Sequence, residues 1–122
     1  MSRQHAKFEI ARVYGAPVAD GRFRILVDRL WPRGIRKKDL HLDAWMKDLA
    51  PSTELRRWFN HESHRWDEFR TRYQVELNAK SPELAELRGI ANEQKVLLLY
   101  AARDEQFNHA VVLKEVLENI GD

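Results

Sequence analysis

The chain has 122 residues, of which 43% are hydrophobic and 33% are charged, and its formal net charge is +2. This composition is typical of a globular protein and excludes a disordered chain. No apolar run approaches the roughly 18 residues that cross a bilayer. The absence of cysteine excludes disulfides, thiolate nucleophiles and the common structural zinc sites. We therefore expect one domain over residues 1–122, and the lack of an apolar signal segment in residues 1–7 favours a cytoplasmic protein without a membrane partner.

Basic residues are concentrated early in the chain. The segment from Arg22 to Asp39 holds seven basic and two acidic residues, which is a net charge of +5. From Leu40 to the end, 11 basic residues face 15 acidic ones, a net charge of −4. Such an asymmetry favours an anionic partner for the basic segment, although a solvated basic loop is the alternative.

The first half of the chain predicts two strands and several connections. Residues 7–14 alternate weakly and indicate a first strand. Residues 15–21 are rich in turn formers, and the β-branched, apolar run 23–28 indicates a buried second strand. The Trp31-Pro32 pair and Gly34 interrupt regular structure. Residues 40–49 fit both a strand and a helix, and we favour a short strand near Trp45.

The second half predicts helices around one more strand. Ser52 is a suitable cap for a helix that begins after Pro51. Residues 63–80 carry an apolar stripe at helical spacing, and the Ser81-Pro82-Glu83 run is typical of a helix start. The apolar run 96–100 predicts a central strand buried on both faces, and residues 107–120 predict a last helix that Gly121 ends. The expected fold class is a three-layer α/β arrangement with a small, mostly parallel central sheet flanked by helices.

Two loops follow the predicted central strands. In open parallel sheets, ligands bind beyond the carboxyl ends of strands. This rule selects residues 28–34, here called the 28–34 loop, and residues 103–109, here called the 103–109 turn. If the two strands are neighbours, both segments meet at one edge of the sheet.

The side chains of these segments suit binding of an anion and acid–base chemistry. Asp28, Asp104 and His109 are the candidate catalytic residues, because carboxylates and imidazoles move protons near neutral pH. Guanidinium groups grip phosphate or carboxylate with two parallel hydrogen bonds, and the start of the last helix adds backbone amides. The candidate substrate-binding residues are therefore Arg29, Trp31, Arg33, Lys37, Arg103 and Asn108, with Trp31 available to stack on a flat ring.

Each of these residues also has a purely structural alternative. Asp28 and Arg29 can form an ion pair, and Asp104 can cap the last helix. His109 can be a packed helix residue, and Trp31 can belong to the core. The hypothesis of a site depends on the convergence of these residues rather than on any one of them.

Other motifs carry less weight. His61 and His64 have a spacing that metal ligands use, but no third ligand is evident, so we predict no metal site. The chain has no glycine-rich phosphate loop and no serine-hydrolase elbow, and no cofactor is predicted.

The run of residues 26–34, Leu-Val-Asp-Arg-Leu-Trp-Pro-Arg-Gly, is specific enough to identify a family. With further matches elsewhere in the chain, it resembles the YeaO-like group of the family called domain of unknown function 488. The resemblance spans about residues 8–117, and the other matches are Trp45, residues 49–52, Glu54-Leu55, Phe69, Tyr73, Glu76-Leu77, residues 98–101 and residues 108–110. It implies a compact α/β protein of bacterial, cytoplasmic type and supplies no activity.

The chain departs from this family at the second segment. The resemblance implies a cysteine and a glutamate after the last strand and a Cys-His-Arg run at the final helix. This chain has Tyr100-Ala101 and Asn108-His109-Ala110 there, so His109 matches and the thiols do not. A mechanism that uses a thiol cannot be transferred to this chain.

Three functions remain open from the sequence. The leading hypothesis is a protein that binds or acts on a small anionic, phosphate-bearing molecule, such as a nucleotide or a sugar phosphate. As an enzyme it would be a hydrolase or a transferase that uses Asp/His acid–base chemistry, although the sequence leaves open whether it is an enzyme. The alternative is a nucleic-acid-binding module that uses residues 22–38, and a protein-interaction module is a third hypothesis. The oligomeric state is not predicted.

Overall fold

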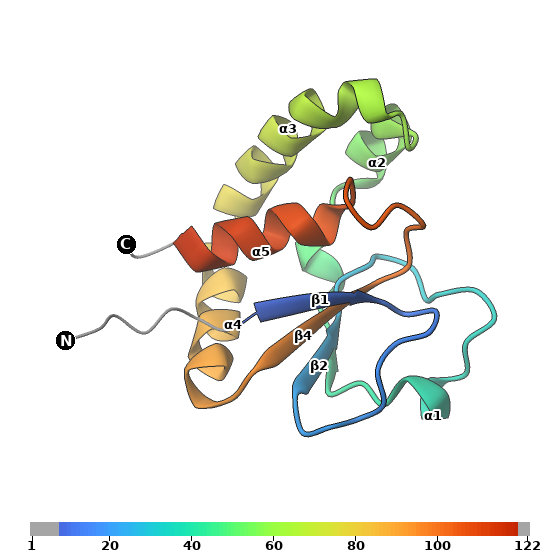
Figure 1. The fold of residues 1–122 in the computed structure, drawn as a ribbon. Coiled ribbons are helices and arrows are strands. Elements are labelled where there is room, and N and C mark those ends of the chain that lie inside the picture. The colour runs from blue at the N-terminus through green and yellow to red at the C-terminus, as the bar shows by residue number, and fades with distance from the viewer. Residues whose placement is uncertain (1–7, 120–122) are drawn as a thin grey trace.

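A computed structural model describes residues 8–119, and Figure 1 shows its strands and helices. The β-strands are β1 (Phe8–Arg12), β2 (Phe23–Leu26), β3 (Ala44–Trp45) and β4 (Val96–Tyr100). The α-helices are α1 (Lys37–Leu40), α2 (Thr53–Phe59), α3 (Trp66–Asn78), α4 (Ser81–Glu93) and α5 (His109–Asn119). Short 3₁₀ turns at Lys47–Leu49 and Ser63–Arg65 precede α2 and α3.

The four described strands form one parallel sheet in the order β1-β4-β2-β3. Strand β4 lies between β1 and β2, with Val96 opposite both Phe8 and Phe23. All five residues of β4 are buried, which confirms the prediction of a central strand from an uninterrupted apolar run. Because β2 and β4 are parallel neighbours, their carboxyl ends lie side by side.

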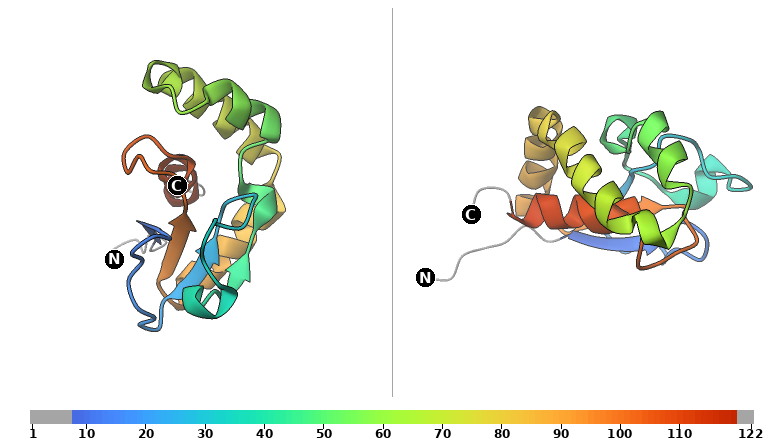
Figure 2. Two further views of the ribbon diagram at one scale, coloured as in Figure 1. Left: turned by 90° about the vertical axis from the view of Figure 1, so that its right-hand side faces the viewer. Right: turned by 90° about the horizontal axis from the view of Figure 1, so that it is seen from above.

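Successive residues of β4 point to opposite faces of the sheet, and each face has its own core. Leu98 belongs to the larger core, which residues of α2, α3, α4 and α5 complete. Leu97 and Leu99 belong to a smaller core with Leu40 of α1. Figure 2 shows α3 and α5 on one side of the sheet and α1 on the other. The predicted three-layer α/β fold is confirmed, with helices crowded on one face and mainly loops on the other.

Several predicted boundaries shift for local reasons. Strand β2 ends at Leu26, two residues early, and the predicted end of the last helix at Ile120 and Gly121 lies outside the described residues. The ambiguous segment 40–49 contains both structures, since β3 is followed by a 3₁₀ turn. Ser81 is the first residue of α4, after Lys80 at the cap position, and its hydroxyl donates to the Asn78 carbonyl. Ser52 caps α2 as predicted and accepts from the Leu55 amide at 3.1 Å.

Within residues 8–119, no helix is both long enough and apolar enough to cross a membrane.

Candidate functional site

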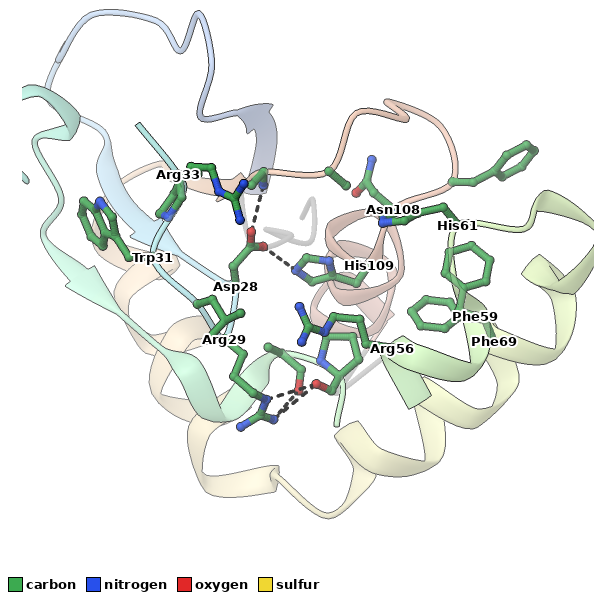
Figure 3. A pocket seen from close by; sticks show the side chains of 17 residues that line it. Asp28, Arg29, Trp31, Arg33, Arg56, Phe59, His61, Phe69, Asn108 and His109 are labelled. Atoms are coloured by element: carbon green, nitrogen blue, oxygen red, sulfur yellow. Dashed lines mark hydrogen bonds and ion pairs between the residues drawn. The ribbon is translucent and has the colours of Figure 1, made fainter. Parts of the chain in front are cut away.

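A cavity of about 350 Å³ opens where β2 and β4 end, and we call it the strand-end pocket (Figure 3). Its position agrees with the rule that places ligands beyond the carboxyl ends of parallel strands. The lining residues come from the 28–34 loop, the loop before α2, helices α2 and α3, and the segment after β4. They are Asp28, Arg29, Leu30, Trp31, Pro32, Arg33, Ala50, Pro51, Arg56, Phe59, His61, Phe69, Ala101, Ala102, Phe107, Asn108 and His109.

Asp28 and His109 meet in this pocket, as the sequence predicted for neighbouring strands. Asp28 Oδ1 lies 3.0 Å from His109 Nε2, and both side chains are largely buried. The other carboxylate oxygen, Oδ2, accepts a hydrogen bond of 2.9 Å from the Ala101 amide. The backbone carbonyl of Asp28 accepts from the Trp45 indole at 2.7 Å. These contacts join the end of β2 to the segment after β4.

The His109 ring is fixed by two acceptors on one nitrogen. Nε2 lies 3.0 Å from the Val27 carbonyl as well as 3.0 Å from Asp28 Oδ1. Two acceptors face this nitrogen, so it carries a hydrogen. The hydrogen bond is directed at the Val27 carbonyl, and Asp28 Oδ1 has no hydrogen-bond partner of its own among residues 8–119. The contact between Asp28 and His109 is therefore a short electrostatic contact rather than an aligned hydrogen bond.

The Tyr73 ring of α3 packs against the His109 ring. The two rings meet edge to face with centroids 6.2 Å apart, and the Tyr73 hydroxyl donates to the Leu49 carbonyl. Complete burial, followed by the negative charges of Asp28 and Glu76, raises the pKa of Tyr73 well above its usual value. Tyr73 therefore stays protonated and acts as a hydrogen-bond donor that holds the loop before α2.

The basic residues of the pocket differ in what they bind. Arg29 donates to the carbonyls of Ala50 and Pro51 over 3.3–3.4 Å, so its guanidinium is used inside the protein. The ion pair between Asp28 and Arg29, which was the structural alternative for these residues, is not formed, because Asp28 contacts His109 instead. Arg33 is exposed, lines the pocket and makes no ion pair or side-chain hydrogen bond with another residue in the described range 8–119.

Arg56 is a lining residue that the sequence interpretation missed. It lies one turn into α2, is exposed, and has no carboxylate partner in the part of the chain that the structure describes. Figure 3 shows its side chain reaching toward the centre of the pocket. The Ser52 cap predicted this helix, but an arginine on the exposed side of a helix is too common to signal a site.

An aromatic wall closes the side of the pocket opposite Asp28. Figure 3 shows Phe59 and Phe69 there with His61 beside them. Phe107 also lines the cavity, and Trp66 contacts both Phe69 and Phe107. The sequence interpretation weighed His61 only as a metal ligand with His64. In the structure His61 turns to the pocket, whereas His64 lies 3.7 Å from Glu62. No group of three potential metal ligands occurs within residues 8–119.

Trp31 lines the pocket but belongs equally to the smaller core. Its indole nitrogen donates to the Ile35 carbonyl at 2.6 Å, and its ring meets Trp45 edge to face at 5.4 Å. These contacts support the structural alternative for Trp31, because both its donor and a large part of its ring are engaged.

The remaining candidates of the 103–109 turn mainly organise the start of α5. Asp104 accepts hydrogen bonds of 2.8 Å from the amides of Phe107 and Gln106, and these bonds lower its pKa below the usual value. Asn108 is buried, donates to the Asp104 carbonyl at 2.9 Å and accepts from the Val111 amide at 3.1 Å, which makes it the cap of α5. Its capping role is why α5 begins at His109 and not at residue 107.

Two predicted binding residues lie away from the pocket. Arg103 and Lys37 are exposed, and neither contributes to the lining of the cavity. Of the predicted site residues, the structure brings together Asp28, Arg29, Trp31, Arg33, Asn108 and His109 around one cavity.

The fold and the pocket define a parallel α/β protein with a basic, partly aromatic cavity at the strand ends. The chain belongs to the family described as the inactive DUF488-N3 subclade, which it matches over residues 7–121. This confirms the resemblance to the domain of unknown function 488.

Two curated relatives have similar length. The uncharacterised protein YeaO of Escherichia coli is 46% identical over 109 residues, covering 89% of this chain and 95% of YeaO. An uncharacterised protein of Mycobacterium tuberculosis is 45% identical over 114 residues, covering 93% of this chain and 96% of the relative. No solved structure matches the chain.

Proposed function

We propose that this protein binds a small anionic, phosphate-bearing molecule in the strand-end pocket. One observation carries the proposal: Arg33 and Arg56 line the cavity without an ion-pair partner in the range 8–119, while Asp28 is the one acidic side chain among its described lining residues. Asp28 already contacts His109 and the Ala101 amide. The pocket therefore presents an excess of positive charge, which an anion of matching size would neutralise.

The pocket has the parts that a phosphate ligand requires. Guanidinium groups bind phosphate oxygens with paired, charge-assisted hydrogen bonds. Arg33 approaches from the 28–34 loop and Arg56 from α2, so the two side chains come from different elements. An anion between them would bridge these elements. His61 and His109 add imidazole nitrogens on the α2 side and at the floor.

Binding without turnover is the form of this function that we favour. The family description calls the subclade inactive, and this chain lacks the thiols that the resemblance implies. Asp28 and His109 are engaged with each other and with backbone groups, which suits a rigid binding floor. Hydrolysis or transfer by Asp28 and His109 stays a prediction, and release of inorganic phosphate from a bound phosphate ester would support it.

Two neighbouring arginines of α2 allow a matched test. Titration calorimetry with inorganic phosphate and nucleoside monophosphates should show binding to the natural protein. Arg56→Ala and Arg33→Ala should each weaken it about tenfold or more, because each removes charge-assisted hydrogen bonds to the anion. Arg57→Ala is the control, since Arg57 is exposed on α2 and does not line the cavity. Equal affinity in all three variants would contradict the proposal.

The nucleic-acid alternative has less support from the basic segment. Four of its seven basic residues pair with other groups of the protein. Arg22 pairs with Glu9 and Asp20, Arg24 binds the carbonyls of Leu40 and Pro17, Arg29 binds those of Ala50 and Pro51, and Arg36 pairs with Asp39. This alternative stays a prediction. Binding to single-stranded nucleic acid that weakens steeply with salt would favour it.

A further inference from the structure

We infer that the ligand of the strand-end pocket carries a flat aromatic ring beside its phosphate, as a nucleoside monophosphate does and a sugar phosphate does not. The inference rests on the proposed function, because it assumes that a phosphate-bearing anion binds here. It distinguishes two classes of phosphate ester, nucleotides and sugar phosphates. The distinction depends on the aromatic wall, which lies on the side of the pocket opposite Asp28.

The pocket has two chemically different sides. Figure 3 shows Asp28 and Arg33 on one side and Phe59, His61 and Phe69 on the other, with Arg56 between them. A ligand that fills the cavity therefore meets cations along one part of its surface and aromatic rings along another. An anion alone would satisfy only the basic side.

The aromatic wall is held in place by rings behind it. Phe59 and Phe69 stack with centroids 4.4 Å apart. Trp66 of α3 lies 5.6 Å from Phe69 and 5.3 Å from Phe107, so it joins α3 to the turn before α5. A surface that is already ordered loses little conformational entropy when a ligand binds to it.

Two rings of this wall remain available for contact. Phe59 and Phe69 are buried, whereas Phe107 is half-buried and His61 is exposed. Asn60 and His61 both adopt the left-handed conformation, with φ of 49° and 56°. Non-glycine residues adopt it uncommonly, with Asn and His among the most frequent exceptions. This turn brings His61 to the cavity, near the Phe59 ring, 6.5 Å away between centroids.

The size and polarity of the pocket favour a ring over a sugar on this side. A volume of about 350 Å³ is near the lower end of the range for small-molecule pockets, which suits one ring and one phosphate. A sugar phosphate would place hydroxyls against phenylalanine side chains, and hydroxyls without hydrogen-bond partners are costly to bury. A flat ring would instead stack on the half-buried Phe107, as bases do on aromatic side chains in other proteins.

The test compares two ligands that share a phosphate ester. Adenosine 5′-monophosphate and ribose 5-phosphate are titrated into the natural protein, into Phe107→Leu and into Trp58→Leu. Leucine keeps apolar volume and removes the ring. Trp58 is the matched control, because it is a half-buried ring of α2 that does not line the cavity. We expect the nucleotide to bind the natural protein about tenfold more tightly than the sugar phosphate. This preference should shrink several-fold in Phe107→Leu and persist in Trp58→Leu.

The outcomes separate this inference from the proposed function. Equal affinity of the natural protein for both ligands would overturn the inference and leave phosphate binding intact. A preference that Phe107→Leu leaves unchanged would also overturn it, because the ring would then lie elsewhere. Failure of both ligands to bind would overturn the proposed function itself. If Phe107→Leu does not fold, as judged by circular dichroism, the ligand comparison on the natural protein decides alone.

Discussion

The 28–34 loop and the 103–109 turn lie at the ends of neighbouring strands, yet they use their polar residues differently. In the 103–109 turn, Asp104 binds backbone amides just before α5, Asn108 binds an amide in the first turn of α5, and Arg103 does not line the pocket. In the 28–34 loop, Asp28 and Arg33 both line the cavity, and Arg33 makes no described ion pair. The loop that precedes no long helix therefore places more of its charged side chains on the cavity.

The difference follows from the needs of a helix start. The first amides of a helix have no partner within the helix and must find one elsewhere. The Asn108 side chain accepts a hydrogen bond from the Val111 amide in the first turn of α5. The Asp104 carboxylate accepts hydrogen bonds from the amides of Gln106 and Phe107, which precede the helix. Polar residues before a helix are therefore poor evidence for a site. His109 reaches the pocket because it is already the first residue of α5.

The strongest test of this comparison removes the charge of Asp28. In Asp28→Asn, the contact with His109 loses its electrostatic attraction and the hydrogen bond from the Ala101 amide loses its charged acceptor. We expect the free energy of unfolding to fall by about 1–3 kcal/mol, measured by urea denaturation. Asp48→Asn is the control, because Asp48 is exposed and makes no described side-chain hydrogen bond. Its effect should stay within about 0.5 kcal/mol. Equal effects of the two substitutions would mean that the Asp28 carboxylate does not hold the strand ends together.

The second test separates two arginines of the 28–34 loop. Arg29→Met removes donors to the carbonyls of Ala50 and Pro51, and these hydrogen bonds are long. We expect a loss of about 1 kcal/mol in the free energy of unfolding. Arg33→Met should change stability by less than about 0.5 kcal/mol and should weaken binding of phosphate ligands. Denaturation and calorimetry on both variants measure the two effects. If Arg33→Met destabilises the protein as much as Arg29→Met, Arg33 is a structural residue and the comparison fails.

Part of the site could be predicted from local sequence patterns. The apolar runs that became β2 and β4 have recognisable length and composition, and the rule for parallel sheets then placed Asp28 and His109 together. That inference needed no knowledge of the helices. It also located the cavity correctly, at the junction of the two strands.

The rest depended on packing between distant segments. Helices α2 and α3 pack over the strand ends and bring to the pocket Arg56, Phe59 and Phe69. No local sequence pattern predicts that packing. Arg29 and Arg33 have identical chemistry, and their roles differ only because the Ala50 and Pro51 carbonyls lie beside Arg29. Before the fold is known, the sequence therefore cannot tell which of two arginines in one loop binds groups of the protein and which has its side chain free.

The smallest expected effect tests the structural role of Asp104 through pH. Hydrogen bonds from the amides of Phe107 and then Gln106 lower its pKa in the folded protein, so the folded state binds this proton more weakly than the unfolded state. The resulting stabilisation is present above about pH 4 and is lost as the pH falls through the lowered pKa. The natural protein should therefore exceed Asp104→Asn in denaturation midpoint near about pH 6, and the difference should narrow toward about pH 3. A difference that stays constant over this range would show that the ionised carboxylate does not stabilise the turn. Asp104 would then not contribute, through its charge, to the stability of the segment before α5.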